Sequence, residues 1–113
     1  MANIEQCDVS GVKVLRLNGS LSQAELEDVQ KSFYDATSEA EAAVVLDLSN
    51  VDYLSTPAIA MFLDAAKTVK ATGGRMVATG AQPRVEEVLK RLRLETVLPV
   101  TGSVNEGVRR VRG

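Results

Sequence analysis

The sequence contains no histidine, no tryptophan and a single cysteine, and these absences exclude several classes of protein. Without histidine the chain lacks the commonest general base and cannot form the Ser-His or Cys-His pairs used in nucleophilic catalysis. Cys7 alone cannot form an intramolecular disulfide. Asp47 and Asp52 are too loosely spaced to indicate a metal site and are more typical of turn residues. We therefore expect a protein that is not an enzyme and holds no metal or other cofactor.

An excess of basic residues and a long apolar run are also missing. The 13 Lys and Arg residues are outnumbered by 15 Asp and Glu, which gives a net charge of −2 and a pI near 5.1. Because nucleic acids and anionic membranes select basic surfaces, the expected partner is a protein or a small molecule. No apolar run approaches the ~20 residues of a membrane span, and the N-terminus lacks the features of a signal peptide. These observations predict a cytoplasmic protein without membrane insertion.

The composition is typical of one folded domain. Hydrophobic residues make up 45% and charged residues 25% of the 113 residues, so we expect a single domain over residues 1–113. Two strands over residues 4–9 and 12–17, joined by Ser10-Gly11, are expected to form a hairpin, with Cys7 as a small core residue. Ser22 and Glu25 form a capping box, which predicts a helix that begins near Gln23.

Further strands and helices alternate along the rest of the chain. Apolar runs and their breakers predict strands over residues 44–48, 75–79 and 97–100, and helices over residues 58–70, from Pro83 onward and after Ser103. Leu17–Leu21 and residues 49–52 are expected to be loops. The order β-β-α-β-α-β-α-β-α predicts an α/β fold with a mixed sheet, an initial hairpin and crossover helices. Sites in such folds gather where strands end, which directs attention to residues 49–56.

Ser55, Thr56 and Pro57 open the helix that follows the central strand. A Thr directly before Pro at this point is expected to be the N-cap, with Pro57 at the first helical position. The positive end of the helix dipole and its free N–H groups would then favour a phosphate on Thr56, by roughly 1 kcal/mol. The alternative is that Thr56 only caps the helix.

The same helix carries two apolar stripes. Ile59, Phe62, Leu63, Ala66 and Val69 form the expected core stripe, and Ala58, Met61 and Ala65 form a second, smaller one that begins beside Thr56. Because Met adapts well to recognition surfaces, the second stripe together with Ser55 and Thr56 is a candidate partner-binding surface. The alternative is that this stripe packs under a neighbouring loop.

Two long segments resemble the STAS domain of bacterial anti-sigma factor antagonists: VVLDLSNVDYLSTPAIAMFL (residues 44–63) and GGRMVATGAQPRVEEVLKRLRLETVLPV (residues 73–100). LNGSL at Leu17–Leu21 is similar to the family's loop before its first helix, so the resemblance covers nearly the whole chain. It implies a single STAS-like domain. It also places Thr56 at the family's phosphorylated position, with Ser55 where the family has Asp, Ala58 in place of a usual glycine and Arg93 in place of another.

The resemblance further implies a partner-switching role. The unmodified domain would bind an anti-sigma factor that is a serine/threonine kinase, and phosphorylation of Thr56, or of Ser55 if the register differs by one, would abolish this binding; a phosphatase would be a further partner. The missing Asp at position 55 favours an alternative: a constitutive, unphosphorylated STAS subunit of a transporter or signalling complex. The sequence makes no prediction of the oligomeric state.

Overall fold

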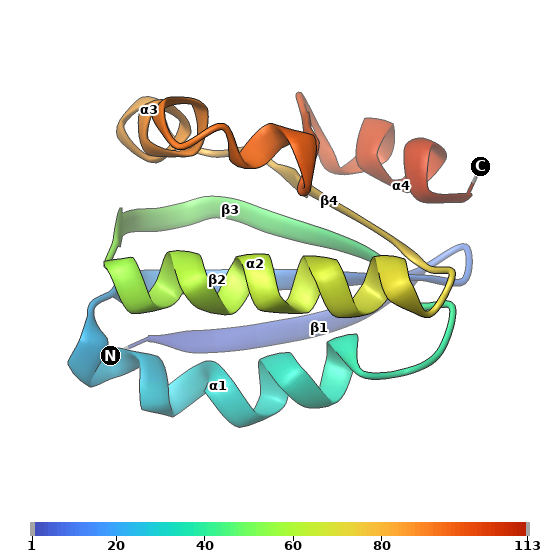
Figure 1. Ribbon diagram of the computed structural model, residues 1–113, viewed down its shortest axis with the longest axis horizontal. Helices are drawn as coiled ribbons and strands as arrows, with labels where there is room; N and C mark the ends of the chain where they lie inside the picture. Colours follow the sequence, from blue (N-terminus) through green and yellow to red (C-terminus); the bar gives the residue numbers. More distant parts are fainter. Residues whose placement is uncertain (1, 113) are drawn as a thin grey trace.

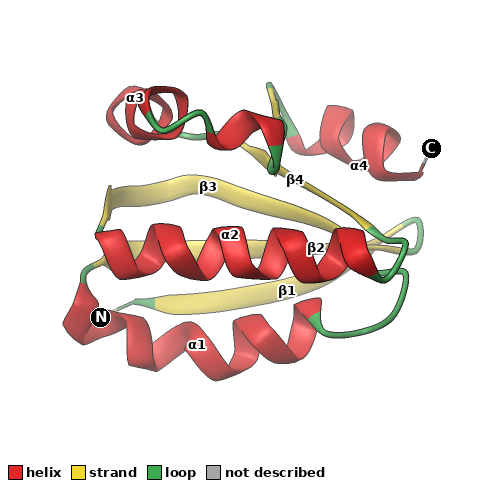
Figure 2. Ribbon diagram, in the orientation of Figure 1, coloured by secondary structure: helices red, strands yellow, loops and turns green. Residues whose placement is uncertain are grey.

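Alternating side chains along the central strands divide the core between the two faces of a five-stranded sheet. Figures 1 and 2 show how the helices and strands are arranged. The computed structural model describes residues 2–112. Its elements are β1 (Asn3–Val9), β2 (Val12–Leu21), α1 (Gln23–Thr37), β3 (Ala43–Leu54), α2 (Thr56–Ala71), β4 (Arg75–Thr79), α3 (Pro83–Arg91), the short 3-10 helix η1 (Leu94–Thr96), β5 (Val100–Thr101) and α4 (Val104–Arg112). The strands lie in the order β1-β2-β3-β4-β5; β1 and β2 are antiparallel and every other pair is parallel. The predicted α/β fold and element order are confirmed.

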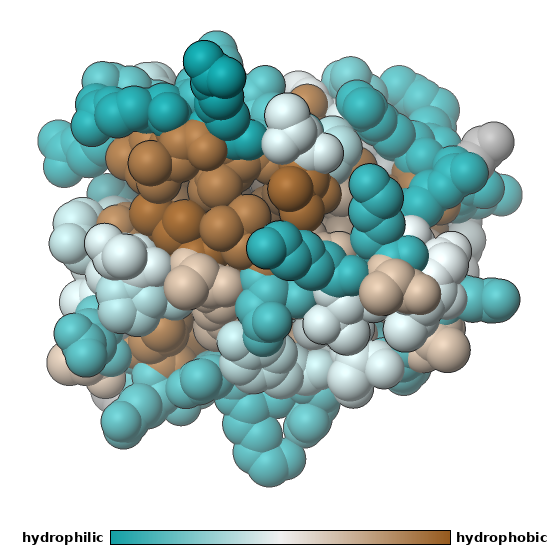
Figure 3. All heavy atoms as spheres, viewed as in Figure 1, coloured by the Kyte–Doolittle hydropathy of each residue, from teal (hydrophilic) through white to brown (hydrophobic). Residues whose placement is uncertain are grey.

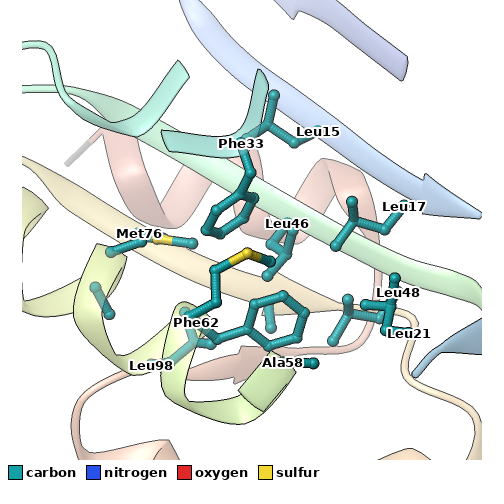
Figure 4. Close-up of a cluster of buried hydrophobic side chains, with 14 of the residues drawn as sticks. Leu15, Leu17, Leu21, Phe33, Leu46, Leu48, Ala58, Phe62, Met76 and Leu98 are labelled. Carbon is teal, nitrogen blue, oxygen red and sulfur yellow. The ribbon is translucent and has the colours of Figure 1, made fainter. Parts of the chain in front are cut away.

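The larger part of the core lies between the sheet and helices α1 and α2. Phe33 of α1 and Phe62 of α2 are fully buried, and their ring centroids lie 5.7 Å apart (Figure 4). The smaller part lies on the other face, where α4 packs Val108 and Val111 against valines of β2, β3 and β4. Because strand side chains alternate between faces, Val44 and Val45 enter different parts of the core.

Two strands are longer than the sequence predicts. β2 runs on through the expected loop to Leu21, with register shifts and a positive φ of 101° at Gly19. β3 likewise continues past Leu48 to Leu54, so the expected turn over residues 49–52 is part of a strand. The two extensions pair with each other from Asn18 to Leu21, which satisfies main-chain groups that a turn would leave to solvent. The start of α2 is therefore held next to the end of β2.

Three other expectations are wrong. Cys7 is exposed, because β1 is an edge strand and its polar face is not covered. The strand expected over residues 97–100 is reduced to Val100–Thr101 after η1, since proline cannot donate to a sheet. Leu92 shares a helical apolar pattern with Val85 and Leu89 in the sequence, which predicts a core position, but Leu92 is 51% exposed. No helix within residues 2–112 combines the length and apolarity that crossing a bilayer requires.

Candidate functional site

Ser55, not Thr56, is the N-cap of α2. Its Oγ accepts a hydrogen bond from the N–H of Ala58 at 3.3 Å and donates one to the carbonyl oxygen of Leu21 at 2.7 Å. The N–H of Ser55 also donates to Leu21 O, at 3.1 Å. The Ser55 hydroxyl thus both donates and accepts a hydrogen bond, and only 7% of the residue is exposed. Ser55 therefore joins β2 to α2 and is not accessible to modifying enzymes.

Thr56 is the first residue of α2, and Pro57 is the second. The prediction that Thr56 caps the helix is wrong by one residue, because Ser55 has the extended backbone and the buried bonds that a cap requires. Thr56 is exposed, and within residues 2–112 its hydroxyl has no hydrogen-bond partner. Of the two adjacent candidate hydroxyls, the structure leaves that of Thr56 accessible.

The N-terminus of α2 offers little to an anion. Pro57 has no N–H, the N–H of Ala58 is bound to Ser55 Oγ, and the N–H of Ile59 is bound to Ser55 O at 3.1 Å. Of the first helical N–H groups, only that of Thr56 remains. The expected stabilisation of a phosphate by several free N–H groups is therefore largely absent here.

The burial of the second, smaller apolar stripe of α2 differs from the prediction. Ala58, Met61 and Ala65 are all buried, Met61 with 2% exposed, and belong to the larger part of the core (Figure 4). This arises because α2 rests on the sheet and against α1 together, and so buries a wider arc than one stripe. These three side chains are therefore not available to a partner, and their predicted role as a docking surface is incorrect.

The outer apolar surface near Thr56 is formed by other residues. Ile59 and Leu63, expected in the core, are only partly buried. Figure 3 shows apolar atoms gathered on the face of the molecule over α2 and α3. Ile59 and Leu63 lie one and two turns beyond Thr56 on the same helix. Sequence reasoning missed this surface because it assigned both residues to the core.

Asp47 is a buried carboxylate near the same end of the sheet. Its Oδ2 lies 3.1 Å from Arg16 Nε on the neighbouring strand, and its Oδ1 accepts from the N–H of Ser49 at 3.0 Å; only 3% of the residue is exposed. Burial alone would raise the pKa of Asp47, but the hydrogen bonds from Ser49 and the Arg16 guanidinium outweigh it, so the pKa lies below its usual value. Across residues 2–112 no three potential ligands cluster into a metal site. The bonds to Arg16 and Ser49 hold the Asp47 carboxylate in the sheet and link β3 to β2.

A model of the STAS domain family matches residues 3–107 of the chain. BtrV of Bordetella bronchiseptica, for which a role as anti-sigma factor antagonist is proposed, is 27% identical over 95 residues, which are 84% of this chain and 82% of BtrV. Among solved structures, an anti-sigma factor antagonist from Mycobacterium paratuberculosis superposes with a TM-score of 0.89 at 16% identity, covering 100% of this chain and 96% of that one. The Bacillus cell fate determinant SpoIIAA in its phosphorylated form gives a TM-score of 0.72 at 17% identity, covering 97% and 100%. These likenesses confirm the fold.

Proposed function

The chain belongs to the STAS domain family, and from this we propose that it is an anti-sigma factor antagonist whose binding to a kinase partner is switched off by phosphorylation of Thr56. The observation that carries the proposal is the accessible hydroxyl of Thr56 beside an apolar helical surface. The name of BtrV, the relative described above, describes it as an anti-sigma factor antagonist, which supports the first part of the proposal. That a phosphorylated form of SpoIIAA has been solved makes modification of this fold a reasonable expectation here.

The partner would bind the surface formed by Ile59 and Leu63, which replaces the buried stripe of Ala58, Met61 and Ala65 in our proposal. Burial of exposed aliphatic side chains supplies roughly 25 cal/mol for each Å² removed from water. Because Thr56 begins the helix that carries Ile59 and Leu63, a partner on this surface would also cover Thr56. The same contact that gives affinity would place the hydroxyl within reach of the kinase.

Phosphorylation would act on this contact through charge. Transfer of the γ-phosphoryl group of ATP to Thr56 Oγ1 adds about −1.5 to −2 charges at pH 7. The N–H groups of Ala58 and Ile59 are already bound, so the helix would compensate this charge only weakly. Burying it in an apolar interface would cost desolvation free energy without a matching gain. The phosphorylated protein would therefore leave its partner without any change of fold.

The test is capture from the protein's own cells followed by mass spectrometry. Trypsin is expected to release residues 32–67 as one peptide, and fragmentation of this peptide distinguishes Thr56 from Ser55. We expect phosphate on Thr56 in part of the population and a kinase bound only to the unmodified part. Phosphate on Ser55 would contradict the accessibility argument. A stable partner with no phosphorylated form under any growth condition would instead support a constitutive STAS subunit.

A further inference from the structure

The first half of β4 forms an open edge of the sheet. All five residues of Arg75–Thr79 pair with β3, but only Ala78 and Thr79 pair with β5. Residues 75–77 therefore have a neighbouring strand on one side only. An edge of this kind presents main-chain hydrogen-bonding groups to an additional strand.

Pro99 explains why the pairing with β5 begins late. The N–H of Arg75 donates to Ala42 O on the β3 side, whereas the N–H of Ala78 donates to Pro99 O on the β5 side, both at 2.8 Å. Because successive residues of a strand direct these groups to opposite edges, the N–H and C=O of Met76 face the same edge as those of Ala78. If the parallel ladder continued, the next donor to Met76 O would be the N–H of residue 99, which proline lacks. Met76 thus leaves one donor and one acceptor at the open edge.

A groove with a volume of about 400 Å³ follows this edge. Met76 and Val77 of β4 line one side of it, and the segment from Thr96 to Pro99 contributes to its lining. The volume falls within the range of known ligand sites. The groove begins where β4 begins, whereas Thr56 follows the end of β3, so the two surfaces lie at opposite ends of the parallel strands.

The charges around the groove are all of one sign. Lys70, Arg75 and Arg110 contribute to its lining, and no acidic side chain does. Within residues 2–112 none of these three cations forms an ion pair with a carboxylate; Arg75 Nη1 lies 3.5 Å from the carbonyl oxygen of Arg110. The chain as a whole carries a net charge of −2, so the positive charge around the groove is opposite in sign to the charge of the whole protein.

We propose that this groove binds a short acidic segment of a partner protein, which adds to β4 as an extended strand. The N–H and C=O of Met76 would pair with the main chain of the segment, and Lys70, Arg75 and Arg110 would bind its carboxylates. The open edge of three residues is roughly 10 Å long, at about 3.3 Å per residue, and accommodates a segment of three to four residues. This site goes beyond the proposed Thr56 switch and does not depend on it.

The experiment titrates the full ¹⁵N-labelled chain with the peptide acetyl-Val-Glu-Glu-Val-amide, whose adjacent glutamates point to opposite faces of an extended strand and so toward α2 and α4, and follows the amide resonances of the chain by NMR. We expect saturable shifts at the Met76 and Val77 amides, and an affinity lowered at least about fivefold by Arg110→Glu. The matched control is Arg109→Glu, an exposed neighbour on α4 outside the groove, which is expected to change the affinity less than about twofold. Lys70→Glu and its control Lys67→Glu on α2 form a second pair with the same expected contrast.

Pro99→Ala tests the main-chain part of the proposal. It supplies the missing N–H, so β5 can extend along Met76 and compete with the peptide. We expect weaker binding of the peptide, and protection of the new amide at position 99 from hydrogen exchange. The proposal would be overturned if the Met76 amide did not shift, or if the corresponding lysine peptide bound equally well. Equal shifts with free glutamate or inorganic phosphate would also overturn it and would indicate a small-anion site. Self-association of the chain through this edge without peptide would overturn it as well.

Discussion

The hydroxyl of Ser55 donates a 2.7 Å hydrogen bond to the carbonyl oxygen of Leu21, which lies 34 residues earlier in the chain. This bond ties the last residue of β2 to the residue that caps α2. It also determines which of two adjacent hydroxyls faces solvent, because Ser55 turns inward and Thr56 follows it at the surface. The relationship between the two residues links the stability of the fold to the proposed switch.

Ser55→Ala is expected to destabilise the protein by about 1–2 kcal/mol. It removes an N-cap and leaves the N–H of Ala58 without its side-chain acceptor in a buried position. Urea denaturation measures the loss. Ser22→Ala provides the comparison, because Ser22 caps α1 through the N–H of Glu25 but is less buried. A loss at Ser55 no larger than that at Ser22 would mean that the bond to Leu21 contributes nothing.

Thr56→Glu is expected to weaken binding of the captured kinase by about tenfold or more, whereas Thr56→Ala should bind constitutively. Both variants should keep their unfolding free energy within about 0.5 kcal/mol of wild type, because Thr56 is exposed. Lys67→Gln changes the net charge by the same amount at an exposed position near the other end of α2 and is the matched control. Calorimetric titration compares the four proteins, and equal affinities for all of them would exclude Thr56 as the switch.

Asp47→Asn is expected to change how stability depends on pH. The native pKa of Asp47 is lowered, so its contribution is complete above the unfolded value of about 3.9 and is lost as the pH falls through the native pKa. Asp47→Asn should therefore be less stable by about 1–3 kcal/mol at pH 7, and its deficit should shrink below pH 4. Denaturation at several pH values measures both effects. Asp52→Asn, at an exposed position, is the control and should lose less than about 0.5 kcal/mol at pH 7. A deficit for Asp47→Asn that stays constant with pH would contradict the assignment.

Arg93→Gly is expected to stabilise the protein by about 0.5–1 kcal/mol. Arg93 has φ 55° and ψ 34°, a left-handed conformation that glycine adopts without the steric cost of a Cβ. The STAS resemblance places a glycine at this position, in agreement with that geometry. Lys67→Gly is the control, because Lys67 is exposed in the interior of α2, where glycine should cost about 1 kcal/mol, and the substitution removes the same charge. Thermal unfolding should move the two melting temperatures in opposite directions, and a shift in the same direction would refute the argument.

The sequence predicted the order of the elements well because their signals are local. The capping spacing of Ser22 and Glu25 recurs in the structure as the bond from Glu25 N–H to Ser22 Oγ. Glu86 and Lys90, like Glu87 and Arg91, are four residues apart in the sequence, a spacing that predicts helical charge pairs, and both pairs form. Each of these signals acts within one turn of helix. No knowledge of distant residues was needed to interpret them.

The errors at the site have a common cause, because each depends on residues far away in the chain. Thr56 has the sequence features of a cap, but the carbonyl of Leu21 makes Ser55 the better one. Met61 could be placed in the core only once α1 and the sheet were known to enclose α2 from two sides. Residues of β3 beyond Leu48 look like a turn until the extension of β2 pairs with them.

The order of the strands across the sheet is the same as their order along the chain. Each strand therefore docks beside the one synthesised just before it, starting from the hairpin of β1 and β2. The chain never has to return to the opposite edge of the sheet, as it does in doubly wound folds, where the strand order reverses at a switch point. Because synthesis proceeds from the N-terminus, the sheet can grow in one direction as the chain leaves the ribosome. The open edge of β4 is then among the last parts of the sheet to be completed.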